Sequence, residues 1–409
     1  MSLFFAIAYL IAEYMRPQSM YDALSGLPLG QVTIIGIIIS FIIEGRKLNN
    51  SNFQNILILA YLFWFFISFL FAFKRDLAWQ PLVDFSKWVI IYFLLINIIN
   101  DRRRLYIFLI VFLLLNFRYT QFAARIWISN GFYSDPRGLN AGGGIGAGFF
   151  QNPNDFGVAI NSVLGISYCM IKSDINKIIR WFKMQWFHIV CTVSMIIAIV
   201  ASSSRGAALG LGVVFLAIWY KSKKKTIGIA FLVIVATAII ALIPDDNRLR
   251  FQGMGSEEDG TSQSRLTLWR AGMRMASEYP ITGVGPNNFI YVNREHYFSE
   301  RLEVQHNVYI QAMSELGYPG LIVFLMMIFG CFYNNRKARK ILKEKQIDDS
   351  FLYGFSHGLD ICVIGFIVNG FFITVLYYPF IWMLLILNVA LLDVVERLSN
   401  DSKNIIYNA

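Results

Sequence analysis

Thr261-Ser-Gln-Ser-Arg-Leu-Thr-Leu-Trp-Arg270 opens the longest polar stretch of this sequence, which continues through Gly283-Val-Gly-Pro-Asn-Asn-Phe289 and closes with Gln305-His-Asn-Val-Tyr309 and Glu315-Leu-Gly317. Apolar runs dominate the remainder: 56% of the 409 residues are hydrophobic and only 15% are charged. This charged fraction is well below that of soluble domains, which are about one-quarter charged. The mean hydropathy of the sequence is +0.53. The sequence therefore predicts an all-α polytopic membrane protein, with residues 261–317 on one side of the membrane.

Apolar runs that approach the roughly 20 residues needed to cross a bilayer predict about twelve transmembrane helices. The first run has no basic flank or cleavage motif, so we expect a retained helix rather than a signal peptide. We expect one integral membrane domain over residues 1–409, with residues 244–318 as a large helical loop between the ninth and tenth helices. The expected spans are 2–16, 28–44, 54–73, 83–100, 105–118, 154–172, 186–202, 206–220, 226–243, 318–334, 354–375 and 379–396.

Basic segments occupy every second loop along this path. The positive-inside rule places such loops in the cytoplasm, so both termini are expected to be cytoplasmic and residues 244–318 to lie outside. Because the charge lies in short loops, the net charge of +10 indicates membrane topology rather than nucleic-acid binding. The basic segments are Arg46-Lys47, Arg102-Arg-Arg104, Lys172 to Lys183, Lys221 to Lys225 and Arg336 to Lys345.

Lysine and arginine are divided unequally between the two sides. This topology puts 21 of the 36 basic residues inside, 13 Lys and 8 Arg, and leaves only Lys74 and Lys87 beside 13 Arg outside. A guanidinium can hold phosphate or carboxylate through two parallel hydrogen bonds, which an ammonium cannot. The outer arginines therefore suggest an anionic ligand, with headgroup contact or ion pairing as the alternative for each one.

A helix is predicted from Ser264 to Glu278. Glu278 is placed to pair with Arg274 one turn earlier, so a structural role accounts for that arginine. Arg265 has no acidic residue four positions away, and it shares one face of the helix with Trp269. Arg265 is therefore freer to hold a ligand.

His306 is a candidate base. A second helix is predicted from Val304 to Gly317, a residue type common just past a helix C-terminus, and His306 would lie in its first turn. The positive end of the helix dipole disfavours imidazolium, and a neutral imidazole can accept a hydroxyl proton. A hydrogen bond to a nearby loop carbonyl is the alternative role.

Arg205 follows Ser202-Ser-Ser204 at the outer end of the seventh span. An arginine at such a position commonly extends to the membrane interface. Gly206, Gly210 and Gly212 would instead let helices approach closely and hold the guanidinium in place. Both interpretations stay open.

No metal or cofactor is expected. The segment Gly142 to Gly148 lacks the Lys-Ser/Thr pair and the strand-to-helix context of a phosphate loop. Asp245-Asp246 and Glu257 to Asp259 are the only acidic clusters expected outside. The cysteines lie in apolar runs without a C-x-x-C pair or a histidine at ligand spacing; they are Cys169, Cys191, Cys331 and Cys362.

Together, these residues resemble the O-antigen ligase and O-antigen polymerase family of bacterial envelope glycosyltransferases. The resemblance implies a GT-C-like membrane fold in the bacterial inner membrane. It also implies a periplasmic active site for a glycan carried on undecaprenyl diphosphate. Within about residues 149–320, it rests on Asn152-Pro-Asn-Asp155, Ser203-Ser-Arg-Gly206, Ser264-Arg-Leu266 with Trp269, Gly283 to Phe289, His306-Asn-Val-Tyr309, and Glu315-Leu-Gly317 with Gly320.

The resemblance also implies roles for single residues. Arg205 and Arg265 would bind the donor diphosphate, and His306 would be the catalytic residue that activates or orients the acceptor hydroxyl. Further candidates for substrate binding are Arg270, Asn307, Asn152 and Arg137.

Fixed guanidinium groups would stabilise the charge that develops on a diphosphate leaving group, and a base on the opposite side would make the transfer inverting and metal-independent. We predict an O-antigen ligase with lipid A-core as acceptor, or alternatively a polymerase of the same family. A protein O-oligosaccharyltransferase ranks below these. A lipid-linked glycan flippase also ranks below them, because transporters more often show related halves. Unlike in some relatives, the last outer loop, Tyr377-Tyr-Pro379, carries no acidic residue.

Overall fold

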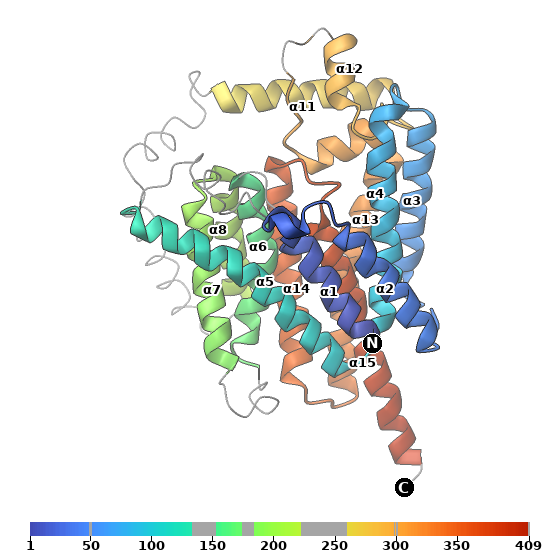
Figure 1. The fold of residues 1–409 in the computed structure, drawn as a ribbon, viewed down its shortest axis with the longest axis vertical. Coiled ribbons are helices and arrows are strands. Elements are labelled where there is room, and N and C mark those ends of the chain that lie inside the picture. Colours follow the sequence, from blue (N-terminus) through green and yellow to red (C-terminus); the bar gives the residue numbers. More distant parts are fainter. Residues whose placement is uncertain are drawn as a thin grey trace.

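The computed structural model describes residues 1–48, 51–132, 153–173, 184–221, 260–297, 299 and 302–407. Within these ranges the regular elements are all helices, and no strand is present (Figure 1). Of the described helices, seven are long and apolar enough to cross a membrane. The prediction of an all-α polytopic membrane protein is therefore confirmed.

Each predicted span coincides with a helix except 226–243, which lies outside the described residues, as do Gly142 to Gly148 and both outer acidic clusters. The helices that correspond to these spans are α1 (Ser2–Tyr14), α2 (Leu29–Ile43), α3 (Phe53–Leu70), α4 (Arg75–Ile98), α5 (Arg102–Ser129), α6 (Pro153–Met170), α7 (Met184–Ala201), α8 (Arg205–Lys221), α13 (Val308–Glu344), α14 (Ser350–Asn369) and α15 (Pro379–Tyr407).

Four predicted boundaries were wrong by more than two turns. Helix α4 begins at Arg75 rather than at residue 83, α13 ends at Glu344 rather than at 334, and α15 ends at Tyr407 rather than at 396. Helix α5 was expected to end at residue 118 but continues to Ser129. Beyond Arg118, one side of the helix remains buried through residues such as Thr120 and Trp127, while Arg125 is exposed. Mean hydropathy falls there, but an amphipathic helix keeps its packing on the buried side.

The two helices predicted over 304–317 and 318–334 form the single helical element α13, which is interrupted at Gly317 (φ 71°, ψ 179°). The Trp64 indole donates to the backbone carbonyl of Leu316, immediately before the interruption, at 2.8 Å. The Tyr318 amide donates to Pro280 O at 2.9 Å. The predicted break at Gly317 is thus present, but the chain continues as a helix on its far side.

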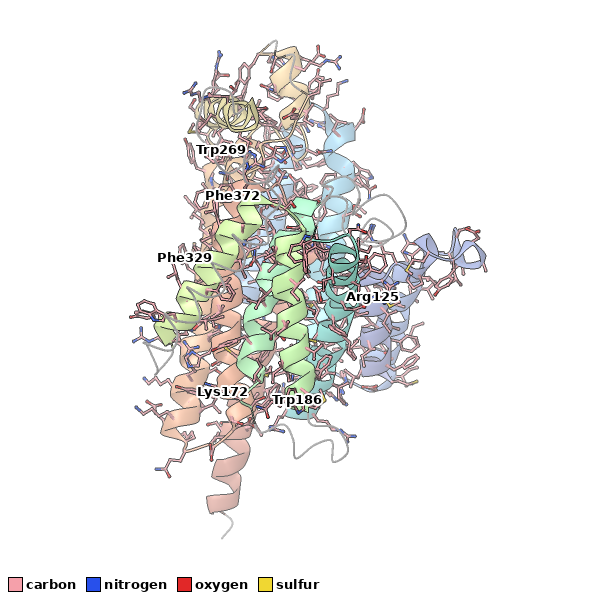
Figure 2. The ribbon with its side chains drawn as sticks, turned by 90° about the vertical axis from the view of Figure 1, so that its left-hand side faces the viewer. Arg125, Lys172, Trp186, Trp269, Phe329 and Phe372 are labelled. Carbon is pink, nitrogen blue, oxygen red and sulfur yellow. The ribbon has the colours of Figure 1, made fainter. Side chains whose placement is uncertain are left out.

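Two groups of connecting segments lie at opposite ends of the helix bundle. Helices α11 (Gly260–Glu278) and α12 (Phe289–Glu295) cross one end, here called the upper end, together with residues 302–307 (Figure 1). Trp269 and Phe372 lie toward this end, whereas Lys172 and Trp186 lie toward the other (Figure 2). The described part of the polar stretch and Lys172 of the basic segments therefore lie toward opposite ends, which is the arrangement that the positive-inside rule requires.

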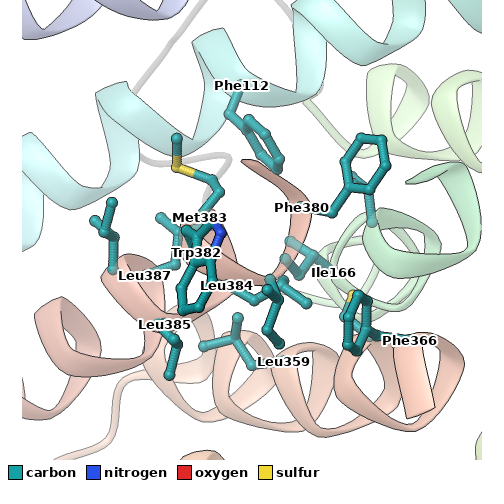
Figure 3. Packing of buried hydrophobic residues seen from close by; sticks show 14 of the residues in the cluster. Phe112, Ile166, Leu359, Phe366, Phe380, Trp382, Met383, Leu384, Leu385 and Leu387 are labelled. Atoms are coloured by element: carbon teal, nitrogen blue, oxygen red, sulfur yellow. The ribbon is translucent and has the colours of Figure 1, made fainter. Parts of the chain in front are cut away.

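Helix α15 lies in the centre of the apolar core. Trp382 is almost fully buried among residues of other helices, and Phe112, Ile166, Leu359 and Phe366 pack around the first turns of α15 (Figure 3). A separate, smaller cluster lies under α11 and α12 at the upper end; it contains Leu268, Met275, Val284, Phe289 and Val292. This second core gives the upper end its own packed support.

Candidate functional site

Helix α11 carries Arg265 of the candidate site and packs against the start of α13. Its helical region covers the predicted span from Ser264 to Glu278, and its buried side carries Leu268 and Met275. At Gly272 an added Cβ atom would lie 2.3 Å from Ile310 Cγ2, so the backbone of α11 rests directly on the first turn of α13. The absence of a side chain at Gly272 permits this contact.

Two hydrogen bonds join α11 to the loop that precedes α13. The Trp269 indole donates to Gln305 O at 2.9 Å, and the Ser264 hydroxyl donates to Glu303 Oε2 at 3.2 Å. These bonds hold Glu303 and Gln305, which lie within the three residues just before His306. The position of the imidazole is therefore set by α11 as well as by α13.

His306 does not lie in the first turn of a helix, and that expectation was wrong. Its backbone is left-handed, with φ 48°, and helix α13 begins only at Val308. Asn307 is the N-cap, and its side-chain oxygen accepts from Tyr309 N at 2.9 Å and Ile310 N at 3.0 Å. The helix starts later than predicted because this cap satisfies its first amide groups.

The charges around His306 nevertheless favour a neutral imidazole. Burial and the positive charge of Arg265 lower the pKa of His306 from its ordinary value, and the carboxylate of Glu303 opposes that shift. Arg265 and His306 thus lie close enough to interact electrostatically. The neutral form is the one that can accept a proton.

Arg205 lies at the start of α8, immediately after a tight turn. Ser203 is left-handed (φ 51°), and the Ser204 hydroxyl accepts from Ala207 N at 3.2 Å. An added Cβ atom at Gly206 would lie 2.7 Å from Phe372 Cβ, and one at Gly210 would lie 2.1 Å from Asn369 Nδ2. Close helix contact was therefore predicted correctly at these two glycines.

Gly212 has a different environment. An added Cβ atom there would meet no atom of the described residues within 4 Å, so within that part of the chain Gly212 supports no close helix contact. Arg205 itself is half-buried and takes part in an interaction within the protein.

A short helical segment, η5 (Gly370–Phe372), connects Arg205 to the histidine loop. Phe372 contacts the first turn of α8, while an added Cβ atom at Gly370 would lie 2.8 Å from Val308 Cγ1. The Tyr309 hydroxyl also donates to Ile367 O at 2.7 Å. The N-terminal end of α8, which begins with Arg205, and the first turn of α13, which begins two residues after His306, therefore contact the same segment.

Among the described residues, the other candidates have different positions. Arg270 lies on the exposed side of α11, and the Asn307 side chain caps α13. Arg274 pairs with Glu278 at 2.8 Å, as predicted. Asn152 and Arg137 lie outside the described residues.

Sequence reasoning missed Glu303. The signal was an acidic residue three positions before the candidate base, in a stretch otherwise rich in arginine. Among the described residues, no three His, Cys, Asp or Glu side chains gather in a way that could hold a metal ion.

The part of the chain that carries these candidate residues matches a known family model. A family model described as O-antigen ligase matches residues 190–325, which include Arg205, Arg265 and His306. A second model, described as a family of unknown function, matches residues 2–185. No curated protein matches the chain. Residues 190–325 therefore match the O-antigen ligase family model, which supports the resemblance to the O-antigen ligase and O-antigen polymerase family.

Proposed function

We propose that this protein transfers a glycan from an undecaprenyl-diphosphate carrier to an acceptor hydroxyl, with inversion at the anomeric carbon. The observation that carries the proposal is the half-buried imidazole of His306 beside Arg265, on a helix end that shares η5 with Arg205. A base and two guanidinium groups at one end of a membrane protein match the needs of this reaction.

The arginines would bind the leaving group. As the bond between the anomeric carbon and the diphosphate oxygen breaks, its electron pair goes to the diphosphate, whose negative charge grows. Guanidinium groups already held in position stabilise such charge without reorganising, and each can contact phosphate oxygens through two N–H groups. Arg205 and Arg265 are the residues proposed for this role.

His306 would act on the acceptor. The neutral imidazole accepts the hydroxyl proton while the acceptor oxygen forms its bond to the anomeric carbon. Attack from the side opposite the diphosphate inverts the configuration. The imidazolium formed beside Arg265 loses its proton readily, because burial and the arginine charge disfavour it.

The acceptor favoured is lipid A-core, which makes the protein an O-antigen ligase; extension of a second lipid-linked glycan, as in a polymerase, is the alternative. We place the reaction on the periplasmic side of the bacterial inner membrane. In this proposal residues 1–409 form one integral membrane domain with a GT-C-like fold, both termini are cytoplasmic, and residues 244–318 form the outer loop.

The test is transfer by purified protein in lipid nanodiscs. The donor is a glycan on undecaprenyl diphosphate, and lipid A-core, a second lipid-linked glycan and a peptide are offered separately as acceptors. Product on lipid A-core identifies a ligase, and product on the second glycan identifies a polymerase.

His306→Ala is expected to lower transfer by about 100-fold or more, the usual loss of a general base. His296→Ala is the matched control, because His296 lies in the same region but packs against Phe73 with ring centroids 4.8 Å apart. Full activity of the His306 variant would refute the proposed base.

A further inference from the structure

One carboxylate is buried beneath the candidate site. Glu315 lies on α13, two residues before the interruption at Gly317, and is only 3% exposed. It accepts hydrogen bonds from the Tyr377 hydroxyl, from Asn287 N at 2.9 Å and from Gln305 Nε2 at 3.4 Å. A buried charge is costly unless it is bonded in this way.

The groups around this carboxylate are hydrogen-bond donors. A hydroxyl, a backbone amide and a side-chain amide nitrogen converge on its two oxygens. The Gln311 side chain also bonds to Glu315, and its amide oxygen accepts from Leu376 N at 3.1 Å, which leaves the nitrogen to donate. Only an ionised carboxylate accepts at every position; a glutamine would present an NH₂ group to some of these donors.

Backbone bonds dock the glycine-rich turn on the same helix. Val284 N donates to Ser314 O at 2.9 Å, and Gly285 N donates to Glu315 O at 3.0 Å. At Gly283 (φ 65°), an added Cβ atom would lie 2.5 Å from the carbonyl carbon of Glu315. The turn therefore lies directly on the α13 backbone, in a conformation and at a distance that require glycine.

Glu315 thus links three segments that are distant in sequence. Asn287 belongs to the turn after α11, Gln305 immediately precedes His306, and Tyr377 belongs to the loop before α15. Gln305 is fully buried, and its carbonyl oxygen accepts the Trp269 indole hydrogen bond. A change at Glu315 is transmitted to His306 through one residue.

We propose that Glu315 is a positioning residue, and that the Glu315 clamp, formed by Glu315 with Asn287, Gln305, Gln311 and Tyr377, fixes the His306 imidazole for proton transfer. This inference rests on the proposed function, because it assigns the clamp to the acceptor-activating base. It also gives the loop before α15, which carries no acidic residue of its own, a carboxylate partner on the neighbouring helix.

The test is Glu315→Gln, measured by activity and by hydrogen exchange. We expect kcat to fall by about ten- to a hundredfold, the cost of a displaced catalytic group, while KM for the lipid-linked donor stays unchanged. Amide exchange should accelerate together in residues 283–289, 302–307 and 375–378. Glu315→Asp, which keeps the charge, should recover part of the kcat.

Glu278→Gln is the matched control. Glu278 is an acidic residue of the same end, but its partners are the nearby Arg274 at 2.8 Å and Tyr297 at 2.7 Å. This variant should leave kcat and exchange at 302–307 unchanged. If Glu315→Gln does not accumulate in the membrane, Tyr377→Phe removes a single donor and should give the same changes on a smaller scale.

Unchanged exchange at residues 302–307 in Glu315→Gln, or in Tyr377→Phe where that variant replaces it, would overturn the clamp. Faster exchange with an unchanged kcat would overturn its positioning role. The two failures can be told apart. If the proposed function is wrong, His306→Ala stays active, whatever the amide exchange of Glu315→Gln shows. If His306→Ala is inactive but amide exchange at residues 302–307 is unchanged in Glu315→Gln, the proposed function stands and only the clamp is rejected.

Discussion

The imidazole of His306 lies between two opposite charges, and this sets the expected pH dependence. Burial and Arg265 lower the pKa of His306, while Glu303 raises it. If the neutral form is the base, kcat/KM rises with pH through a pKa below the ordinary value of 6.5. Glu303→Gln removes the negative charge, so imidazolium is less favoured and this acidic limb should move to lower pH.

A profile of kcat/KM against pH for the wild type and Glu303→Gln checks this prediction. Glu295→Gln is a suitable control, because Glu295 pairs with Arg294 at 2.8 Å on α12. A limb that moves to higher pH in the Glu303 variant, or that persists unchanged in His306→Ala, would contradict the assignment.

Arg205 and Arg265 make a second residue-scale prediction. Replacing either with Lys keeps the charge but removes the planar pair of donors, so KM for the lipid-diphosphate donor should rise about tenfold, the loss of one charged hydrogen bond. Arg274→Lys is the control, since the exposed Arg274 pairs with Glu278. Donor titrations that superimpose for wild type and both variants would remove the arginines from the diphosphate site.

At the scale of elements, α8 offers a matched pair of glycines. Gly210 faces Asn369 of α14 so closely that an added Cβ atom would lie 2.1 Å from Nδ2, while none of the described residues lies within 4 Å of a Cβ atom added at Gly212. Gly210→Leu should push α8 away from α14, lower thermal stability by about 1–3 kcal/mol and reduce transfer by moving Arg205. Gly212→Leu should change neither. Melting curves in detergent and the transfer assay measure both effects; equal behaviour of the two variants would reject this packing.

The helices themselves were largely predictable because hydropathy reports apolar length. It does not report where a helix with one buried side ends, which is why α5 was predicted too short. The late start of α13 depends on the left-handed backbone of His306. Asn307, a strong N-cap residue type followed by Val308, was the signal in the sequence that could have placed it.

The candidate site was predictable only in part, for a related reason. Arg265 and His306 lie in one polar stretch, so sequence alone suggested both. Their connection to Arg205 passes through η5, which is more than 60 residues beyond His306 in the chain. The role of Glu315 depends on donors from three separate segments, and no periodic pattern encodes such long-range hydrogen bonds.

At the scale of the whole molecule, the unequal distribution of basic residues between the two ends predicts which end faces the periplasm. The upper end carries α11 and α12, and the opposite end carries the basic C-terminal part of α13, from Arg336 to Lys343. Ser277 is exposed on α11, and Lys340 is 70% exposed near the end of α13. If the upper end is periplasmic, a membrane-impermeant maleimide added to intact spheroplasts should label Ser277→Cys and leave Lys340→Cys unlabelled until the membrane is permeabilised.

The native cysteines interfere little with this measurement. Cys191, Cys331 and Cys362 are buried, and the half-buried Cys169 can be replaced by Ala in the background of both variants. Labelling of Lys340→Cys in intact spheroplasts, with protection of Ser277→Cys, would invert the topology. Arg205, Arg265 and His306 would then face the cytoplasm, and a periplasmic transfer reaction would no longer be tenable, because all three residues belong to the same end as α11.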